Sequence, residues 1–292
     1  MSQALGYRTG PPPRDYSPAV RRALRLALVY AVALILAAIV IVPLLYVVLG
    51  GFRTTGQIAA QPVALPNPWN VGNYTEIAGS GTFWGLVVNS MVIALVATGL
   101  VVATGALAAF PLARFDFRGR EVLYTAFTLG LLFPVGVAVL PLYLLLRDIN
   151  LLDNAIGVAL PEAAFGLPVT IVILRPFMRA IPAELEDAAV IDGCSRFAFF
   201  WRILIPLSLP ALTTVAILSF VGSWNAFLLP LLVLDNPDHW TLPLGVSNYS
   251  SQYTQDTARI LAFTALSMVP ALAFFVLAER RIVGGLSGGV KG

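Results

Sequence analysis

The amino-acid sequence predicts an all-α membrane protein with six transmembrane helices. Two observations come from its composition: the mean hydropathy of the 292 residues is +0.85, and only 11% of them are charged. A soluble domain usually carries about 25% charged residues, so this chain is too apolar to be one. The third observation is a series of six long apolar runs, because a helix of about 20 apolar residues spans a bilayer.

The six runs are expected to form six helices in chain order. They cover residues 26–49, 82–113, 122–146, 155–174, 203–234 and 260–278. The first run is too long for the apolar region of a signal peptide and no cleavage site follows it, so we expect it to remain as a span. Prolines inside several runs favour a packed bundle, because neighbouring helices can satisfy the carbonyls that a proline leaves free.

The basic residues predict that both termini lie in the cytoplasm. In this orientation fifteen of the 18 lysines and arginines are cytoplasmic, and Arg53, Arg147 and Arg259 are outside. That asymmetry agrees with the positive-inside rule. The net charge of +3 is therefore attributed to topology, and no nucleic-acid partner is expected. A single cysteine and a single histidine exclude a disulfide framework and give no support to a metal site.

Three regions are expected along the chain. They are a Pro-rich cytoplasmic segment (1–22), a six-span domain (23–282) with a cytoplasmic loop at 180–206, and a Gly-rich cytoplasmic tail (283–292). The glycines of the tail do not make a P-loop, because that motif needs a lysine that is followed by serine or threonine. The only lysine, Lys291, is followed by glycine. The chain is therefore not expected to be an enzyme that hydrolyses ATP.

The loop between the fourth and fifth runs contains an unusual charged stretch, "ELEDAAVIDGCSRF". Pro182 can open a helix, and the acidic residues that follow suit its positive end. Gly193 then permits a sharp bend. One interpretation is an amphipathic helix on the membrane surface. The other is a docking helix whose small apolar face fits a groove on a cytoplasmic protein. The acidic turn suits anionic lipid poorly, which favours docking.

The same stretch resembles the EAA loop of ATP-binding-cassette (ABC) importer permeases. That pattern is Glu-Ala-Ala, three residues, then Gly, with Ile-x-Leu-Pro further on, and here it reads Asp187-Ala188-Ala189, Gly193 and "ILIP". Asp replaces Glu, and Ile replaces Leu. The segments "NPWNVGNYTEI", "ARFDFRGR", "FVGSWNAFLLPL" and "RRIVGGLSGGVKG" resemble the carbohydrate branch, which includes the second permease of the maltose transporter. The likeness extends from about residue 52 to the C-terminus.

This resemblance implies the type I permease fold of ABC importers, with a cytoplasmic coupling helix. It implies a permease subunit of an ATP-driven importer that moves a sugar or oligosaccharide across the bacterial cytoplasmic (inner) membrane. The implied partners are a second homologous permease in a heterodimer, an ABC ATPase dimer and an extracytoplasmic solute-binding protein. ATP and Mg would be bound by the ATPase, and this chain would hold no cofactor. The implied coupling residues are Glu184, Asp187, Ala188, Ala189, Asp192 and Gly193.

A sugar pathway is expected where polar groups interrupt the spans. Glu162 is an acid inside the fourth run, and Ser223, Trp224 and Asn225 combine hydrogen-bonding groups with an aromatic face. Two other interpretations stay open. Glu162 would lie only about 12 Å from the outer surface if the helix starts near residue 154, and polar residues often mediate ordinary helix packing. The family usually has an acid after "WN", whereas this chain has Ala226.

The polar, aromatic outer loop before the last run is the expected contact with the binding protein, through Asn248, Tyr249, Gln252 and Tyr253. A neutral cargo is favoured because no basic residue lies inside the spans. The sequence leaves two other functions open besides the importer. An ion-coupled secondary transporter would use an intramembrane acid such as Glu162. A membrane scaffold would use residues 184–202 only to recruit a cytoplasmic protein.

Overall fold

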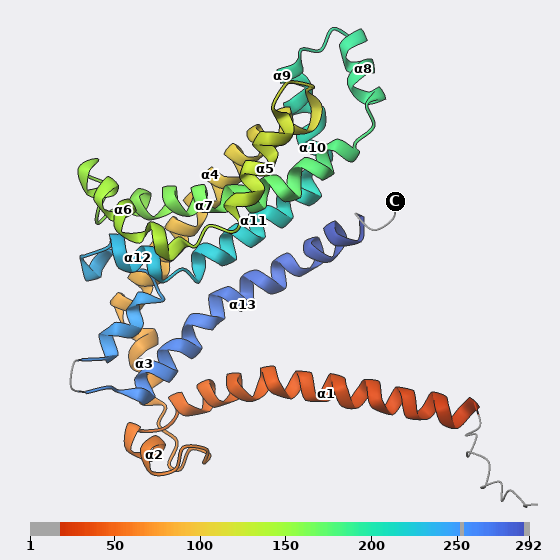
Figure 1. The fold of residues 1–292 in the computed structure, drawn as a ribbon. Helices are drawn as coiled ribbons and strands as arrows, with labels where there is room; N and C mark the ends of the chain where they lie inside the picture. The colour runs from red at the N-terminus through yellow and green to blue at the C-terminus, as the bar shows by residue number, and fades with distance from the viewer. Residues whose placement is uncertain (1–17, 252–253, 289–292) are drawn as a thin grey trace, which may run out of the picture.

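The computed structural model describes the backbone of residues 18–251 and 254–288, and most of these residues are helical (Figure 1). The one β-type feature among them is an isolated bridge between Ser250 and Gln255. The all-α prediction is therefore confirmed for the described part of the chain.

Three helices are each long and apolar enough to cross a membrane by themselves. They are α1 (Pro18–Gly51), α4 (Gly81–Arg114) and α7 (Ala155–Ala180), and they contain the first, second and fourth predicted runs. The starts of α4 and α7 are set by local capping, because the Ser80 and Asn154 side chains accept hydrogen bonds from backbone N–H groups of the first turn.

The third and fifth runs form broken helices. The third is divided into α5 (Arg120–Gly130) and α6 (Val135–Asp148), whose axes differ by 98°. Pro134 is the N-cap of α6, where its missing N–H costs no hydrogen bond. In the fifth run, the helical stretch Arg196–Leu207 meets α11 (Leu209–Trp224) at 75°. The short helix α12 (Leu228–Val233) follows α11.

The last run lies in α13 (Thr257–Gly288). Over Thr257–Ala273 it is a shorter apolar helix. The residues that the structure describes therefore contain three spans, or up to five if each bent pair is one span. A count of six remains a prediction.

The core is made by α4, α7 and α11, which lie side by side in Figure 1. The approach of α4 to α7 is close because Gly105 has no side chain: a Cβ there would lie 2.2 Å from Cγ2 of Thr170. Small residues at such crossings are typical of membrane helices. At one end of the bundle α8 (Glu184–Ile191) projects from the core, and we call this the α8 end.

The opposite end carries α2 (Thr55–Ala60), α3 (Gly72–Gly79) and the 3₁₀ helices η2 (Pro237–His239) and η3 (Leu244–Tyr249). We call this the α3 end. Arg53 is buried there and its guanidinium donates to the backbone carbonyls of Gln57, Gln61 and Pro62 at 2.5–3.0 Å. These bonds fix the loop that follows α1.

Candidate coupling helix and transport cavity

The helix α8 stands away from the core at the end of the molecule (Figure 1). The expected helix is present, but it begins at Glu184 with Ala183 as N-cap, so Pro182 precedes the helix and does not lie in its first turn. Three acidic residues lie in its first turn, Glu184, Glu186 and Asp187. Their carboxylates are favoured there by the positive end of the helix dipole.

The two alanines of the EAA-like motif face in different directions. Asp187 and Ala188 are exposed, whereas Ala189 is only 6% exposed and packs in the cluster that contains Phe199 and Phe200. Ala189 therefore fixes α8 on its own chain, and its contact with a partner remains a prediction. The exposed apolar surface of α8 comes mainly from Leu185, Val190 and Ile191, which are 42%, 60% and 85% exposed. Val190 and Ile191 are not among the expected coupling residues.

Gly193 ends α8 in a Schellman motif. Its φ is +77°, a left-handed conformation that side chains with a Cβ rarely adopt. The Cys194 N–H donates to the Ala189 carbonyl at 2.8 Å, and the Gly193 N–H donates to the Val190 carbonyl at 3.0 Å. A Cβ at Gly193 would meet no described atom within 4 Å, so backbone conformation rather than space requires glycine. The expected bend is confirmed.

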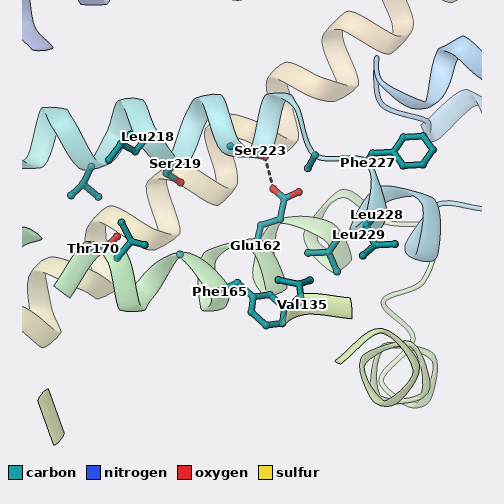
Figure 2. A pocket seen from close by; sticks show the side chains of 15 residues that line it. Val135, Glu162, Phe165, Thr170, Leu218, Ser219, Ser223, Phe227, Leu228 and Leu229 are labelled. Carbon is teal, nitrogen blue, oxygen red and sulfur yellow. Dashed lines mark hydrogen bonds between the residues drawn. The ribbon is translucent and has the colours of Figure 1, made fainter. Parts of the chain in front are cut away.

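A cavity of about 540 Å³ lies between α7 and α11, close to α12 and the start of α6. Its polar lining comes from Glu162, Thr170, Ser219 and Ser223, and the rest is mostly apolar. The Ser223 hydroxyl donates to Oε2 of Glu162, as Figure 2 shows. Oε1 of Glu162 is buried and accepts no hydrogen bond from any residue in the described ranges. The structure therefore brings together two of the four residues expected on the pathway.

The other two lie on a different side of α11. Trp224 is 4% exposed and stacks on Phe220, with ring centroids 6.0 Å apart. The Asn225 amide donates to the Val221 carbonyl of its own helix at 2.8 Å. Both residues line a second cavity, of about 640 Å³, whose other walls include α1 and α13. The four residues therefore do not form one site.

Asn248 and Tyr249 lie at the α3 end, in η3 and beside a polar cavity of about 420 Å³. Burial raises the pKa of the Tyr249 phenol above its usual value, because the ionised form would lose hydration. The cavity wall is fixed by Thr55, whose hydroxyl donates to Asp256 at 2.8 Å. Gln252 and Tyr253, also expected at this contact, lie outside the described residues.

Two arginines at the α8 end, which the sequence presents only as topology signals, are buried in the structure. The side chains of Arg114 and Arg175 are only 6% and 7% exposed. Both follow long apolar runs, Arg114 in the last turn of α4 and Arg175 before the last turn of α7. That position can be recognised in a sequence, but it does not distinguish a buried guanidinium from one that reaches water.

Comparison with known proteins decides the family. The family model described as "Binding-protein-dependent transport system inner membrane component" matches residues 101–281. The chain belongs to the binding-protein-dependent ABC transporter permeases. It is a multi-pass permease subunit of the inner membrane, in the carbohydrate uptake branch, and not an enzyme.

Similar permeases have been named for several sugars. The chain is 36% identical to the diacetylchitobiose uptake system permease protein NgcG of Streptomyces coelicolor, over 90% of this chain and 88% of that protein. It is 37% identical to the trehalose transport system permease protein SugB of Mycobacterium tuberculosis, over 78% of this chain and 84% of that protein.

A solved structure has the same fold. This is the crystal structure of a bacterial ABC transporter involved in the import of the acidic polysaccharide alginate. One of its chains matches with a TM-score of 0.76 and 22% identity, over 91% of this permease and 98% of that chain. At this identity the match supports the fold of the permease and nothing about its cargo.

Proposed function

We propose that this permease is one half of a heterodimeric channel in an ATP-driven importer of a neutral sugar or oligosaccharide. A second homologous permease completes the channel, and an ABC ATPase dimer binds ATP and Mg and drives it. An extracytoplasmic binding protein delivers the cargo. The sugar assignment rests on relatives named for diacetylchitobiose and trehalose. An ion-coupled transporter and a membrane scaffold are both disfavoured by membership of this family.

The observation that carries the proposal is the geometry of α8. An exposed Asp187–Ala188 pair lies on a short helix that projects from the core and ends in a fixed bend at Gly193. The exposed Leu185 and Ile191 add apolar area around the pair. A small amphipathic helix of this kind suits a groove on a partner protein. We therefore infer that α8 docks on the ATPase through Glu184, Asp187, Ala188, Asp192 and Gly193, with Ala189 beneath them.

The cavity between α7 and α11 supports a sugar pathway. Sugar hydroxyls are hydrogen-bond donors, and the buried Oε1 of Glu162 is an acceptor that no described residue uses. Ser223 holds the other oxygen and so fixes the direction of the carboxylate. None of the lining residues is basic, which favours a neutral cargo. Trp224 and Asn225 would reach a sugar only through the second cavity.

The proposal also includes the membrane topology and the three regions expected from the sequence. They are six spans, both termini in the cytoplasm, and the division into residues 1–22, 23–282 and 283–292. In this orientation the α8 end is cytoplasmic and the α3 end faces outward. Asn248 and Tyr249, beside the polar cavity of the α3 end, would then meet the binding protein.

The test is affinity purification of the tagged chain from its native host in mild detergent, with mass spectrometry of the proteins that copurify. A variant carries Asp187→Arg and Gly193→Pro. Proline fixes φ near −65°, so it cannot adopt the +77° of Gly193. The control is Asp116→Arg, which changes an exposed acid in the loop after α4, and loss of its surface pair with Arg120 should matter little.

The native chain and the control should recover a P-loop ATPase and a second permease. The α8 variant should retain the second permease and lose at least tenfold of the ATPase. If the α8 variant retains the ATPase, docking through α8 is wrong. If the native chain is monodisperse and recovers no ATPase, the ATP-driven assembly is wrong.

A further inference from the structure

The two buried arginines of the α8 end differ in how well they are paired. Two of the three guanidinium nitrogens of Arg175 have partners: its Nε donates to the Leu112 carbonyl at 3.0 Å and its Nη2 pairs with Glu121. Its guanidinium also lies over the Tyr124 ring, 3.9 Å from the centroid. These contacts make Arg175 a satisfied buried cation that joins α7 to α5 and to the end of α4.

Arg114, in the last turn of α4, lacks such partners. Its Nε and Nη2 are buried and make no hydrogen bond with any residue in the described ranges. The Phe199 ring is 5.9 Å away, at the limit of a cation–π contact. Two buried guanidinium nitrogens without hydrogen bonds are costly, and such groups in a folded protein need an explanation.

The nearest carboxylate to Arg114 belongs to the candidate coupling helix. Oε2 of Glu186 lies 3.8 Å from Nε of Arg114, and its side chain is 22% exposed. This distance is within the range of an ion pair but beyond that of a hydrogen bond, which is about 2.7–3.2 Å. A movement of α8 toward α4 by roughly 1 Å would close the bond. Glu186 precedes the EAA-like motif and was not selected from the sequence.

We propose that Arg114 is a positioning residue for energy coupling, because it forms a charge-assisted hydrogen bond with Glu186 when α8 is pushed toward the core. The inference rests on the proposed docking of α8 on an ATPase. The pair then has two arrangements, open at 3.8 Å as observed and closed when the ATPase moves α8. Closing the pair links α8 to the end of α4, so that movement of α8 is transmitted to α4.

The packing of α4 explains how closure of the Arg114–Glu186 pair would affect the transport cavity. α4 has its most extensive contacts with α7, and the close approach at Gly105 leaves no slack between the two helices. α7 carries Glu162 into the cavity. A force applied at Arg114 therefore reaches the cavity through tightly packed helices, which resist continuous deformation.

The test needs a readout of the cavity that does not depend on knowing the sugar. The complex is purified with its own ATPase and second permease, in a background that carries Cys194→Ser and Ser219→Cys. Cys194 is the only native cysteine of the chain, and Ser219 lines the cavity. The rate at which a maleimide labels position 219 is compared in the nucleotide-free complex and after trapping with ATP and vanadate. Trapped nucleotide is measured in the same samples.

In the parent complex, trapping should change the labelling rate at least fivefold. Complexes that carry Arg114→Gln or Glu186→Gln should trap as much nucleotide as the parent complex. Trapping should change their labelling rate less than twofold. The double variant should be no worse than either single variant, because both remove one contact. Arg114→Lys should retain part of the change in labelling rate, since lysine keeps the positive charge. The control Arg118→Gln, an exposed arginine of the neighbouring loop, should behave as the parent.

Three outcomes would overturn the inference. They are nucleotide trapping by Arg114→Gln with the fivefold change retained, an Arg114→Lys complex as defective as Arg114→Gln, and a double variant whose defect is the sum of the two single defects. In each case the ATPase is still bound, so the proposed function stands. If Arg114→Gln does not assemble, Glu186→Gln and Arg114→Lys carry the test. Loss of the ATPase from the parent complex would instead refute the proposed function.

Discussion

Replacing Glu162 with Gln should lower the rate of sugar transport without lowering the stability of the permease. The carboxylate accepts one hydrogen bond, from Ser223, while its buried Oε1 accepts none from the described residues. A buried polar atom without a partner costs about 1–3 kcal/mol. We infer that the sugar supplies the missing donor during transport. Glu162→Gln preserves the shape of the side chain and removes the charge.

The contacts of Glu162 predict the effect of the substitution on sugar uptake and its effect on stability. A hydrogen bond to a charged group contributes about 1.5–3 kcal/mol, and 1.4 kcal/mol corresponds to a factor of ten. Glu162→Gln should therefore lower kcat/KM for sugar uptake by about 10- to 100-fold. The free energy of unfolding should stay the same or rise, because an incompletely paired buried charge has been removed.

The assay is uptake of the radiolabelled sugar that the importer's binding protein carries, with thermal unfolding of the purified complex measured alongside. The control is Thr213→Val, on α11 but outside the cavity lining, where the hydroxyl bonds only its own helix. It should change uptake less than threefold. Unchanged uptake by Glu162→Gln with a lower melting temperature would refute the reasoning and make Glu162 a structural residue.

Two further predictions concern packing and pH. Gly105→Val should destabilise the permease by about 1–3 kcal/mol through its clash with Thr170, whereas Gly99→Ala, with no described atom within 4 Å, should leave the melting temperature unchanged. Burial acts to raise the pKa of Asp153, but hydrogen bonds from the Asn236 N–H and from His239 outweigh it and lower that pKa. Its stabilisation is present above the unfolded value of about 3.9 and is lost as pH falls through the folded value. Asp153→Asn should therefore lower the melting temperature near neutral pH, with no difference in strong acid.

Local features of the sequence predicted much of the fold. The helices α1, α4 and α7 follow from apolar length, because transfer to a bilayer depends on composition within each segment. The bend at Gly193 follows from the freedom of its backbone. The run 122–146 was expected to be one helix and is bent by 98° beside Pro134. Proline predicts that a break can occur, but neighbouring helices decide its angle.

The sequence by itself therefore determined the long helices α1, α4 and α7, the bend at Gly193 and the acidic first turn of α8, since each depends on residues close together in the chain. The tertiary structure decided which side chains meet. Glu162 and Ser223 are 61 residues apart in sequence and come into contact only because α7 packs on α11. Trp224 follows Ser223 directly, yet successive helical residues point about 100° apart, so it faces a different cavity. Arg114 meets Glu186 for the same reason: helix packing, which local spacing does not encode, sets the contact.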